Sequence, residues 1–312
     1  SWTHYDNPIL KNYSSDTHNV VGFDPVRNAY VGYWRGRFPV DGENPQIRRT
    51  IAYSQTHSFN DWPTPKTIVT TDGLDTPDID IYTNAFTPWP GTHFYLMFPA
   101  FYQRTQDVTG IHMLTSRDGI KWNRLLRDPI IQSGEPGTPS VGSIYAGAGL
   151  IETTSGEVSL VVTPLTNTHN QDLKPDTPWG AERSPGYYFA RWRKDGFTSI
   201  ECDADGYFST IPLKFDGERL EVNLWTRFGG EISFELADAS DETRGHDAEP
   251  IPGRTFSDCD RITGDHLNHV VTWKGESNVD SLTGRLVRLR VRMCRARLYS
   301  LKFSRNITSW IP

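Results

Sequence analysis

The sequence predicts an all-β protein in which a β-propeller is followed by a β-sandwich. Short stretches of alternating apolar and polar residues recur along the chain, aromatic residues make up 12% of it, and no long helical pattern is present. Residues 54–62, 116–122 and 191–197 end in the same kind of motif. Their aromatic anchors and Trp2 stand about 60 residues apart, with a longer last interval, and such a period in a strand-rich chain is typical of a propeller.

Residues 1–206 are expected to form the propeller. Each repeat contains three alternating segments suited to inner strands, and an outer strand is expected after each anchor, as at residues 65–70. The expected inner strands are residues 19–24, 29–35 and 48–54, then 79–87, 93–102 and 110–116, then 143–152, 157–163 and 185–192. Because the first residues resemble the end of a repeat, we expect the end of one blade plus three blades, with an upstream segment or a partner chain completing the ring.

Residues 207–312 are expected to form the β-sandwich, because the alternation there is strong and turn residues separate its segments. The expected strands are residues 212–236, with 230–236 as a separate segment, and 269–273, 285–294 and 298–303. Arginines recur between residues 285 and 297, which is compatible with a polyanion site. A solvated strand face balanced by the acidic residues 240–247 is the favoured interpretation.

The composition excludes several classes of partner. A net charge of −6 over 312 residues argues against nucleic acid and anionic membranes as partners. No run of about 18 apolar residues is present, so no membrane span is expected. Cys202, Cys259 and Cys294 do not have metal-ligand spacing; a Cys259–Cys294 disulfide and buried free thiols are both compatible with the sequence.

Carboxylates recur where the innermost strand of each blade begins, the position at which a propeller points side chains at its channel. Asp16 stands there in the first repeat, Asp78 and Asp80 in the second, and Glu135 in the third. Converging carboxylates are what glycoside hydrolysis needs, because one must donate a proton while another acts as nucleophile or base. The alternative is that these acids cap turns, and for Glu135 the turn interpretation is favoured.

Further residues are candidates for binding a sugar. His18 and His169 could bind hydroxyl groups, Arg35 could hold a carboxylate or a hydroxyl, and Tyr82 and Trp179 could stack on a ring, as Trp89 could. Asp78 is counted with this substrate-binding group. For each of these residues a structural or packing role is the competing interpretation. Arg127-Asp128-Pro129 matches a triplet of family 32 glycoside hydrolases, but its place after Trp122 indicates a linker between blades.

The chain resembles a group of bacterial proteins similar to glycoside hydrolase families 32 and 43, in which a five-bladed propeller is joined to a β-sandwich. The motifs that carry the resemblance are Asp16-Thr17-His18-Asn19, residues 32–37, residues 116–122, residues 193–197, residues 258–260 with 264–265, and residues 296–300. The resemblance implies a sugar-cleaving enzyme with an Asp/Asp/Glu trio, in which Asp16 and Asp80 take the ionised roles and Glu135 is the acid. Two departures are that only three blades are complete and that residues 138–141 lack an expected acidic residue.

The sequence therefore predicts an exo-acting glycoside hydrolase for a poly- or oligosaccharide. Asp16 would be base or nucleophile, Asp80 its stabilising partner and Glu135 the proton donor. The alternatives are a non-catalytic carbohydrate-binding propeller and a structural interaction domain. No cofactor and no metal ligand set are expected, and acidic residues alone do not decide whether Ca²⁺ occupies the channel.

Overall fold

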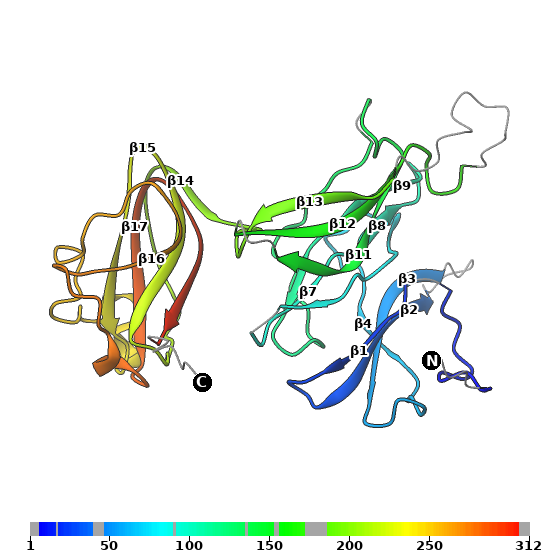
Figure 1. Ribbon diagram of the computed structural model, residues 1–312, viewed down its shortest axis with the longest axis horizontal. Helices are drawn as coiled ribbons and strands as arrows, with labels where there is room; N and C mark the ends of the chain where they lie inside the picture. Colours follow the sequence, from blue (N-terminus) through cyan, green and yellow to red (C-terminus); the bar gives the residue numbers. More distant parts are fainter. Residues whose placement is uncertain are drawn as a thin grey trace, which may run out of the picture. The chain divides into compact units, whose positions relative to one another are not determined.

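The computed structural model describes residues 6–16, 18–39, 47–89, 92–134, 137–152, 156–171 and 186–305 (Figure 1). The chain divides into two compact units: Ser1–Ile151 with Ser159–Arg191, and Glu152–Val158 with Trp192–Pro312. The predicted all-β class is confirmed, since the described elements are strands apart from the short 3₁₀ turns η1 (Glu242–Asp247) and η2 (Asp280–Leu282). The described residues include no helix that could span a membrane.

The first sheet follows the sequence prediction closely. Its strands are β1 (Val20–Asp24), β2 (Ala29–Pro39), β3 (Ile47–Thr56) and β4 (Lys66–Val69), antiparallel and in chain order. The β1–β2 turn forms because the Asp24 carboxylate accepts a hydrogen bond from Val26 N at 2.9 Å and Asn28 adopts a left-handed φ of 50°. The three inner strands and the outer strand are therefore all present.

The second repeat is more broken than predicted. It contains two three-stranded sheets, ordered β5-β8-β9 and β6-β7-β10. Their strands are β5 (Ile79–Ile81), β6 (Thr87–Pro88), β7 (Tyr95–Met97), β8 (Ala100–Gln103), β9 (Val108–Ile111) and β10 (Leu114–Ser116). The expected strand 79–87 breaks because Thr83 and Asn84 side chains accept hydrogen bonds from Ala100 N and Phe86 N, and because Ala85 has a φ of 43°. Pro99 has no N–H to continue the neighbouring strand.

The third sheet contains β11 (Ser143–Glu152), β12 (Glu157–Leu165) and β13 (Tyr188–Arg193) in that order. Within the first unit, neighbouring sheets are held together by side chains. Tyr33 of β2 stacks on Phe86 with ring centroids 4.0 Å apart. Thr109 Oγ1 of β9 both donates to Ile144 O and accepts from Ile144 N, at 2.8 Å each. The described strands nevertheless form separate sheets and no closed ring, so five blades are not observed.

Two of the three copies of the repeat motif, residues 54–62 and 116–122, are turns that fix a tryptophan. The indole Nε1 of Trp122 donates to the carbonyl of Gly119 at 3.2 Å, and that of Trp62 donates to Phe59 O at 2.6 Å, three residues earlier in both cases. Asp118 closes its turn by accepting from Ile120 N and Lys121 N, and these bonds lower the pKa of Asp118. In these two copies the motif therefore has a structural role.

The second unit contains one four-stranded sheet where a two-sheet sandwich was expected. Its strands are β14 (Ile200–Ser209), β15 (Arg219–Asp238), β16 (Asp265–Val270) and β17 (Val287–Ser304), ordered β14-β17-β15-β16. β17 joins two predicted strands, because Arg295 takes a left-handed φ of 45° and lets the strand bend without ending. The boundary expected between residues 206 and 207 falls inside β14.

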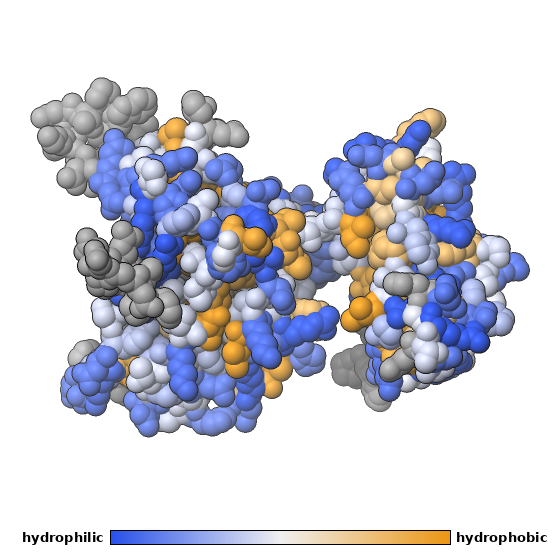
Figure 2. All heavy atoms as spheres, turned by 180° about the vertical axis from the view of Figure 1, so that it is seen from behind, coloured by the Kyte–Doolittle hydropathy of each residue, from blue (hydrophilic) through white to orange (hydrophobic). Residues whose placement is uncertain are grey.

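The core of the second unit lies on one face of this sheet. Leu220, Val222 and Leu224 alternate along β15 and are buried with Phe234 and Trp273, whose indole donates to Phe234 O at 2.9 Å. All three cysteines are free thiols, so the Cys259–Cys294 disulfide is not formed. The face seen in Figure 2 is largely hydrophilic, and its hydrophobic groups are scattered, as is normal for a globular surface.

Candidate active site

The candidate site of the first unit begins with Asp16. Tyr13 Oη donates to Arg35 O at 2.9 Å, and Arg35 N donates to Ser15 Oγ at 3.2 Å, so the segment before β1 lies along β2. The Asp16 carboxylate then pairs with Arg35 Nη1 at 2.8 Å and with Arg37 Nη2 at 3.6 Å. Asp16 is 54% exposed whereas the Arg35 side chain is 1% exposed. A buried cation therefore presents an exposed carboxylate.

The Tyr82 ring lies at the centre of this group of residues. The Arg35 guanidinium stacks on it, with Cζ 3.9 Å from the ring centroid, and Arg35 Nη2 donates to Tyr82 O at 2.8 Å. Arg49 of β3 is also near the ring, with its Cζ at 5.0 Å. The rings of Tyr102 and His169 have centroids 5.9 and 4.5 Å from that of Tyr82. We call Asp16, His18, Arg35, Arg49, Tyr82, Tyr102 and His169 the Tyr82 cluster.

Asp80 lies beneath this cluster and is completely buried. Arg49 Nη1 donates to its Oδ2 at 2.8 Å, while Arg104 donates from Nη2 to Oδ1 at 2.8 Å and from Nε to Oδ2 at 3.1 Å. The second arginine therefore holds the carboxylate as a bidentate pair. In this arrangement Asp80 has no surface for a sugar to touch. It positions Arg49, which in turn lies against Tyr82.

The two histidines of the cluster act as neutral groups at pH 7. Burial, reinforced by the nearby Arg35 charge, lowers the pKa of His18, whose Nδ1 accepts from Ala85 N at 3.4 Å. Burial also lowers the pKa of His169, although the Asp107 charge opposes the shift. Its Nδ1 shares a hydrogen bond of 2.8 Å with Tyr145 Oη. Neutral imidazoles can donate to or accept from a hydroxyl group.

Asp78 is placed differently from Asp80. Its carboxylate accepts from Thr76 Oγ1 at 2.7 Å and from Thr105 N at 3.4 Å, and these bonds lower its pKa. Both partners belong to its own turn and to the adjacent one, and no contact with the Tyr82 cluster is present among the described side chains. Asp78 therefore behaves as a turn-capping acid, the competing interpretation considered from sequence.

Two predicted site residues, Glu135 and Trp179, lie outside the described residues, as does Thr17 of the Asp16 motif. Trp89, a third stacking candidate, is buried. Arg127 pairs with exposed Asp72 at 2.7 Å and with Asp75 at 3.5 Å. This surface pairing agrees with the interpretation of the Arg-Asp-Pro triplet as a linker.

Several members of the site were not predicted from the sequence. Arg49 and Arg104 supply the counter-charges of Asp80, and Tyr102 donates to Asp107 at 2.7 Å, a carboxylate that also accepts from Asn170 Nδ2. Asp80 was predicted inside a strand, where a buried acid needs a cationic partner. That requirement could have indicated that arginines such as Arg49 and Arg104 pair with it. Among the described residues no group of three His, Cys, Asp or Glu side chains could hold a metal ion.

No protein-family model matches the chain, and no curated protein matches it either. Solved structures that do match include an N-acetylgalactosamine deacetylase from F. plautii in complex with blood group B trisaccharide (14% identity, TM-score 0.40, 55% of this chain and 49% of that one). A glycoside hydrolase matches with 13% identity and a TM-score of 0.42, over 60% of this chain and 51% of that one. The GH32 beta-fructofuranosidase BmSUC1 of Bombyx mori matches with 11% identity and a TM-score of 0.29, over 89% and 77%.

The chain spans about half the length of the first two of these structures. The matched structures thus include glycoside hydrolases, at identities below 15% and TM-scores below 0.5. Such distant likeness carries no argument about activity, which has to rest on the Tyr82 cluster itself.

Proposed function

We propose that the chain is a glycoside hydrolase that acts from the end of a poly- or oligosaccharide, with its active site at the Tyr82 cluster. The observation that supports this most is the presentation of Asp16, a half-exposed carboxylate held by a buried guanidinium that is itself stacked on Tyr82. A catalytic carboxylate must be fixed in direction yet open to the substrate. Asp16 meets both requirements.

The proposed roles differ from residue to residue. Asp16 is the nucleophile or the base that activates water, and Glu135 is the proton donor. Asp80 is a positioning residue, because it reaches the substrate only through Arg49 and Tyr82. Neutral His18 and His169 bind hydroxyl groups of the sugar, and Arg35 is a scaffold for Asp16. The sheets of the first unit are part of a five-bladed propeller in this proposal.

To test this, the turnover of Asp16→Asn on a panel of oligosaccharides is measured from the reducing ends that are released. We expect kcat to fall about 10²- to 10⁴-fold, the usual contribution of a positioned acid or base. Asp61→Asn is the matched control, because Asp61 is an exposed acid outside the cluster and its loss changes the net charge equally. Full turnover by Asp16→Asn on every substrate that the wild type cleaves would rule out the proposed site.

One observation favours a second candidate, a non-catalytic carbohydrate-binding protein. Asp80, which lies beneath the Tyr82 cluster, is fully buried and its carboxylate oxygens are occupied by arginines, so one of the predicted catalytic acids cannot contact a sugar. This function predicts that the wild type binds glycans but releases no reducing ends in long incubations. In that case Asp16→Asn would raise the Kd for the glycan, and neither the variant nor the wild type would show turnover.

A further inference from the structure

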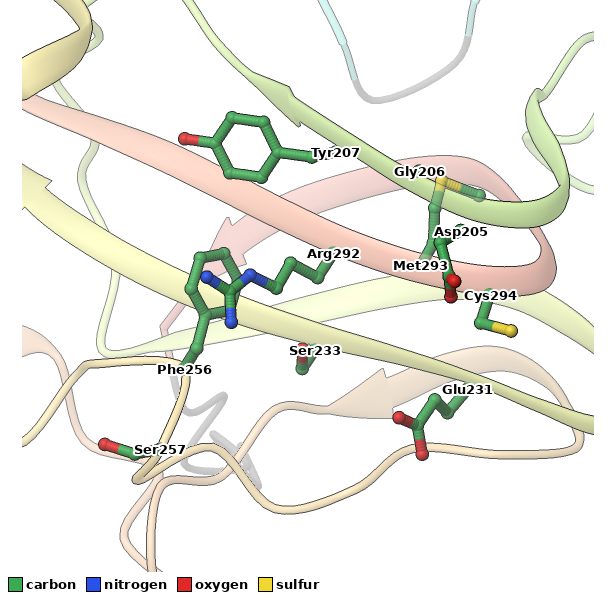
Figure 3. Close-up of a pocket in the computed structure, with 10 residues that line it drawn as sticks. All are labelled: Asp205, Gly206, Tyr207, Glu231, Ser233, Phe256, Ser257, Arg292, Met293 and Cys294. Carbon is green, nitrogen blue, oxygen red and sulfur yellow. The ribbon is translucent and has the colours of Figure 1, made fainter.

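A separate pocket of about 580 Å³ opens on the sheet of the second unit (Figure 3). The strand register explains which side chains line it. Arg292 of β17 is paired with Tyr207 of β14 on one side and with Ser233 of β15 on the other. Two residues further along, Cys294 is paired in the same way with Asp205 and Glu231. Because side chains alternate along a strand, these two rows share one face.

A loop residue, Phe256, forms one wall of the pocket, and a buried ion pair holds it there. Arg290 Nη1 donates to Glu235 Oε1 at 2.8 Å, and both side chains are about nine-tenths buried. Glu235 Oε2 accepts from Phe256 N at 3.1 Å, while Arg290 Nη2 donates to Ala248 O at 2.7 Å. The wall is therefore fixed by charge-assisted hydrogen bonds before any ligand arrives.

Arg292 is the basic residue of the lining. Its guanidinium stacks on Phe256, with Cζ 4.2 Å from the ring centroid, as Figure 3 shows. Arg292 is exposed, and among the described residues it has neither a hydrogen-bond nor an ion-pair partner. Two nearby arginines do have one, since Arg261 pairs with Glu231 at 2.5 Å and Arg290 pairs with Glu235. Arg292 thus presents a set of unused N–H donors at the pocket.

The opposite end of the pocket carries acceptors. In Figure 3 Asp205, Cys294 and Glu231 lie together, away from the guanidinium of Arg292. Burial, and a hydrogen bond to Asp205, raise the pKa of Cys294, so its thiol stays protonated at neutral pH. Glu231 Oε2 pairs with Arg261, and both of these side chains are exposed. Asp205, which accepts a hydrogen bond from the Cys294 thiol, is a second charged acceptor at this end.

We propose that this pocket binds an acidic sugar, with the carboxylate of the sugar on Arg292 and its hydroxyl groups on Ser233 and Asp205. A guanidinium presents a planar fork that matches a carboxylate in a bidentate pair. Phe256 and Tyr207 supply apolar surface for the C–H face of a sugar ring, and the volume of the pocket falls in the usual range for small-molecule sites. The site does not depend on the Tyr82 cluster or on hydrolysis.

Isothermal titration of the full chain with a trimer of galacturonate tests the proposal, with the neutral trimer of galactose and a sulfated trimer as comparisons. We expect the galacturonate trimer to bind more tightly than the other two, and Arg292→Ala to raise its Kd at least about tenfold, the loss of a charge-assisted pair. Arg292→Lys should recover part of the affinity, because it restores the charge without the fork.

Arg305→Ala is the matched control, since Arg305 is an exposed arginine outside the pocket and its removal changes the net charge equally. Asp16→Asn reports on the other unit and should leave this Kd unchanged. Unaltered binding by Arg292→Ala, loss of binding in Asp16→Asn, equal affinity for the neutral trimer, or no galacturonate binding at millimolar concentration would each overturn the assignment.

Discussion

Both units contain a guanidinium stacked on an aromatic ring, but only one of the two arginines has a carboxylate partner. In the first unit Arg35 lies 3.9 Å from the Tyr82 centroid and pairs with Asp16 of its own chain. In the second unit Arg292 lies 4.2 Å from the Phe256 centroid and has no carboxylate partner among the described residues. The same stack therefore orients an acid in one unit and offers donors for an external acid in the other.

A second comparison concerns the buried carboxylates beneath these stacks. Asp80 is held by Arg49 and Arg104, and Glu235 is held by Arg290. Asp80 fixes a side chain, since Arg49 reaches Tyr82, whereas Glu235 fixes a backbone segment through Phe256 N. Each buried acid supports its stack from behind, so a neutral replacement of either acid should affect both the stability of its unit and the function assigned to that stack.

The largest expected effect comes from Asp80→Asn. Removing one partner of a buried ion pair leaves charge uncompensated, so we expect the free energy of unfolding of the first unit to fall by about 3 kcal/mol in urea denaturation. Asp78→Asn is the control and should cost less than about 1 kcal/mol, because Asp78 accepts from Thr76 Oγ1 and Thr105 N at the end of the same strand.

The parallel variant in the second unit is Glu235→Gln. It should destabilise that unit and weaken galacturonate binding, because it releases the Phe256 wall, while leaving the turnover attributed to Asp16 unchanged. A loss of turnover in Glu235→Gln together with intact galacturonate binding would reverse the roles assigned to the two buried acids.

The next largest effect is expected on acidification, which should lower the stability of the first unit. His112 of the first unit is buried and stacks on Phe101 at 4.1 Å, and burial lowers its pKa to about 3 from an ordinary value of 6.5. Between these values the unfolded chain binds a proton that the folded chain does not, so stability is lost as the pH falls. We expect this group to cost about 2 kcal/mol between pH 6.5 and 4.5.

His112→Phe keeps the stack with Phe101 and removes the titrating group. Urea denaturation followed at several pH values should therefore show a shallower loss of stability in this variant than in the wild type. An identical pH dependence in both proteins would mean that His112 is protonated without cost in the folded state.

Local patterns allowed the strands of the first sheet to be predicted, because alternation and turn chemistry at Asp24 and Asn28 are properties of neighbouring residues. The breaks at Ala85 and Pro99 depend on side chains that replace ladder hydrogen bonds across strands. The bend at Arg295 has no glycine or proline to announce it, so β17 was divided into two expected strands. The predicted and observed strands differ at these positions because the breaks and the bend depend on tertiary contacts and backbone conformation, which the local sequence pattern does not show.

The candidate site, like the fold, was predicted in part from the sequence. Asp16, His18, Arg35, Tyr82 and His169 were singled out from sequence, and the structure brings them into one cluster. Arg49 and Arg104 were not, because their ion pairs with Asp80 join residues far apart in the sequence. The open guanidinium of Arg292 could not be foreseen either, since a missing partner is visible only when the neighbours are placed.

The smallest expected effect concerns Arg127, whose triplet resembles a catalytic motif. Both terminal guanidinium nitrogens of Arg127 pair with Asp72, and these two side chains are exposed to solvent. Its longer contact, with buried Asp75 at 3.5 Å, is backed up by Arg124, which pairs with the same carboxylate. Exposed ion pairs contribute little, so Arg127→Ala should lower the free energy of unfolding by less than about 1 kcal/mol and leave turnover and galacturonate binding unchanged. Urea denaturation and the oligosaccharide assay check both parts. A fall in turnover of Arg127→Ala comparable to that of Asp16→Asn, with stability intact, would move the active site from the Tyr82 cluster to the linker.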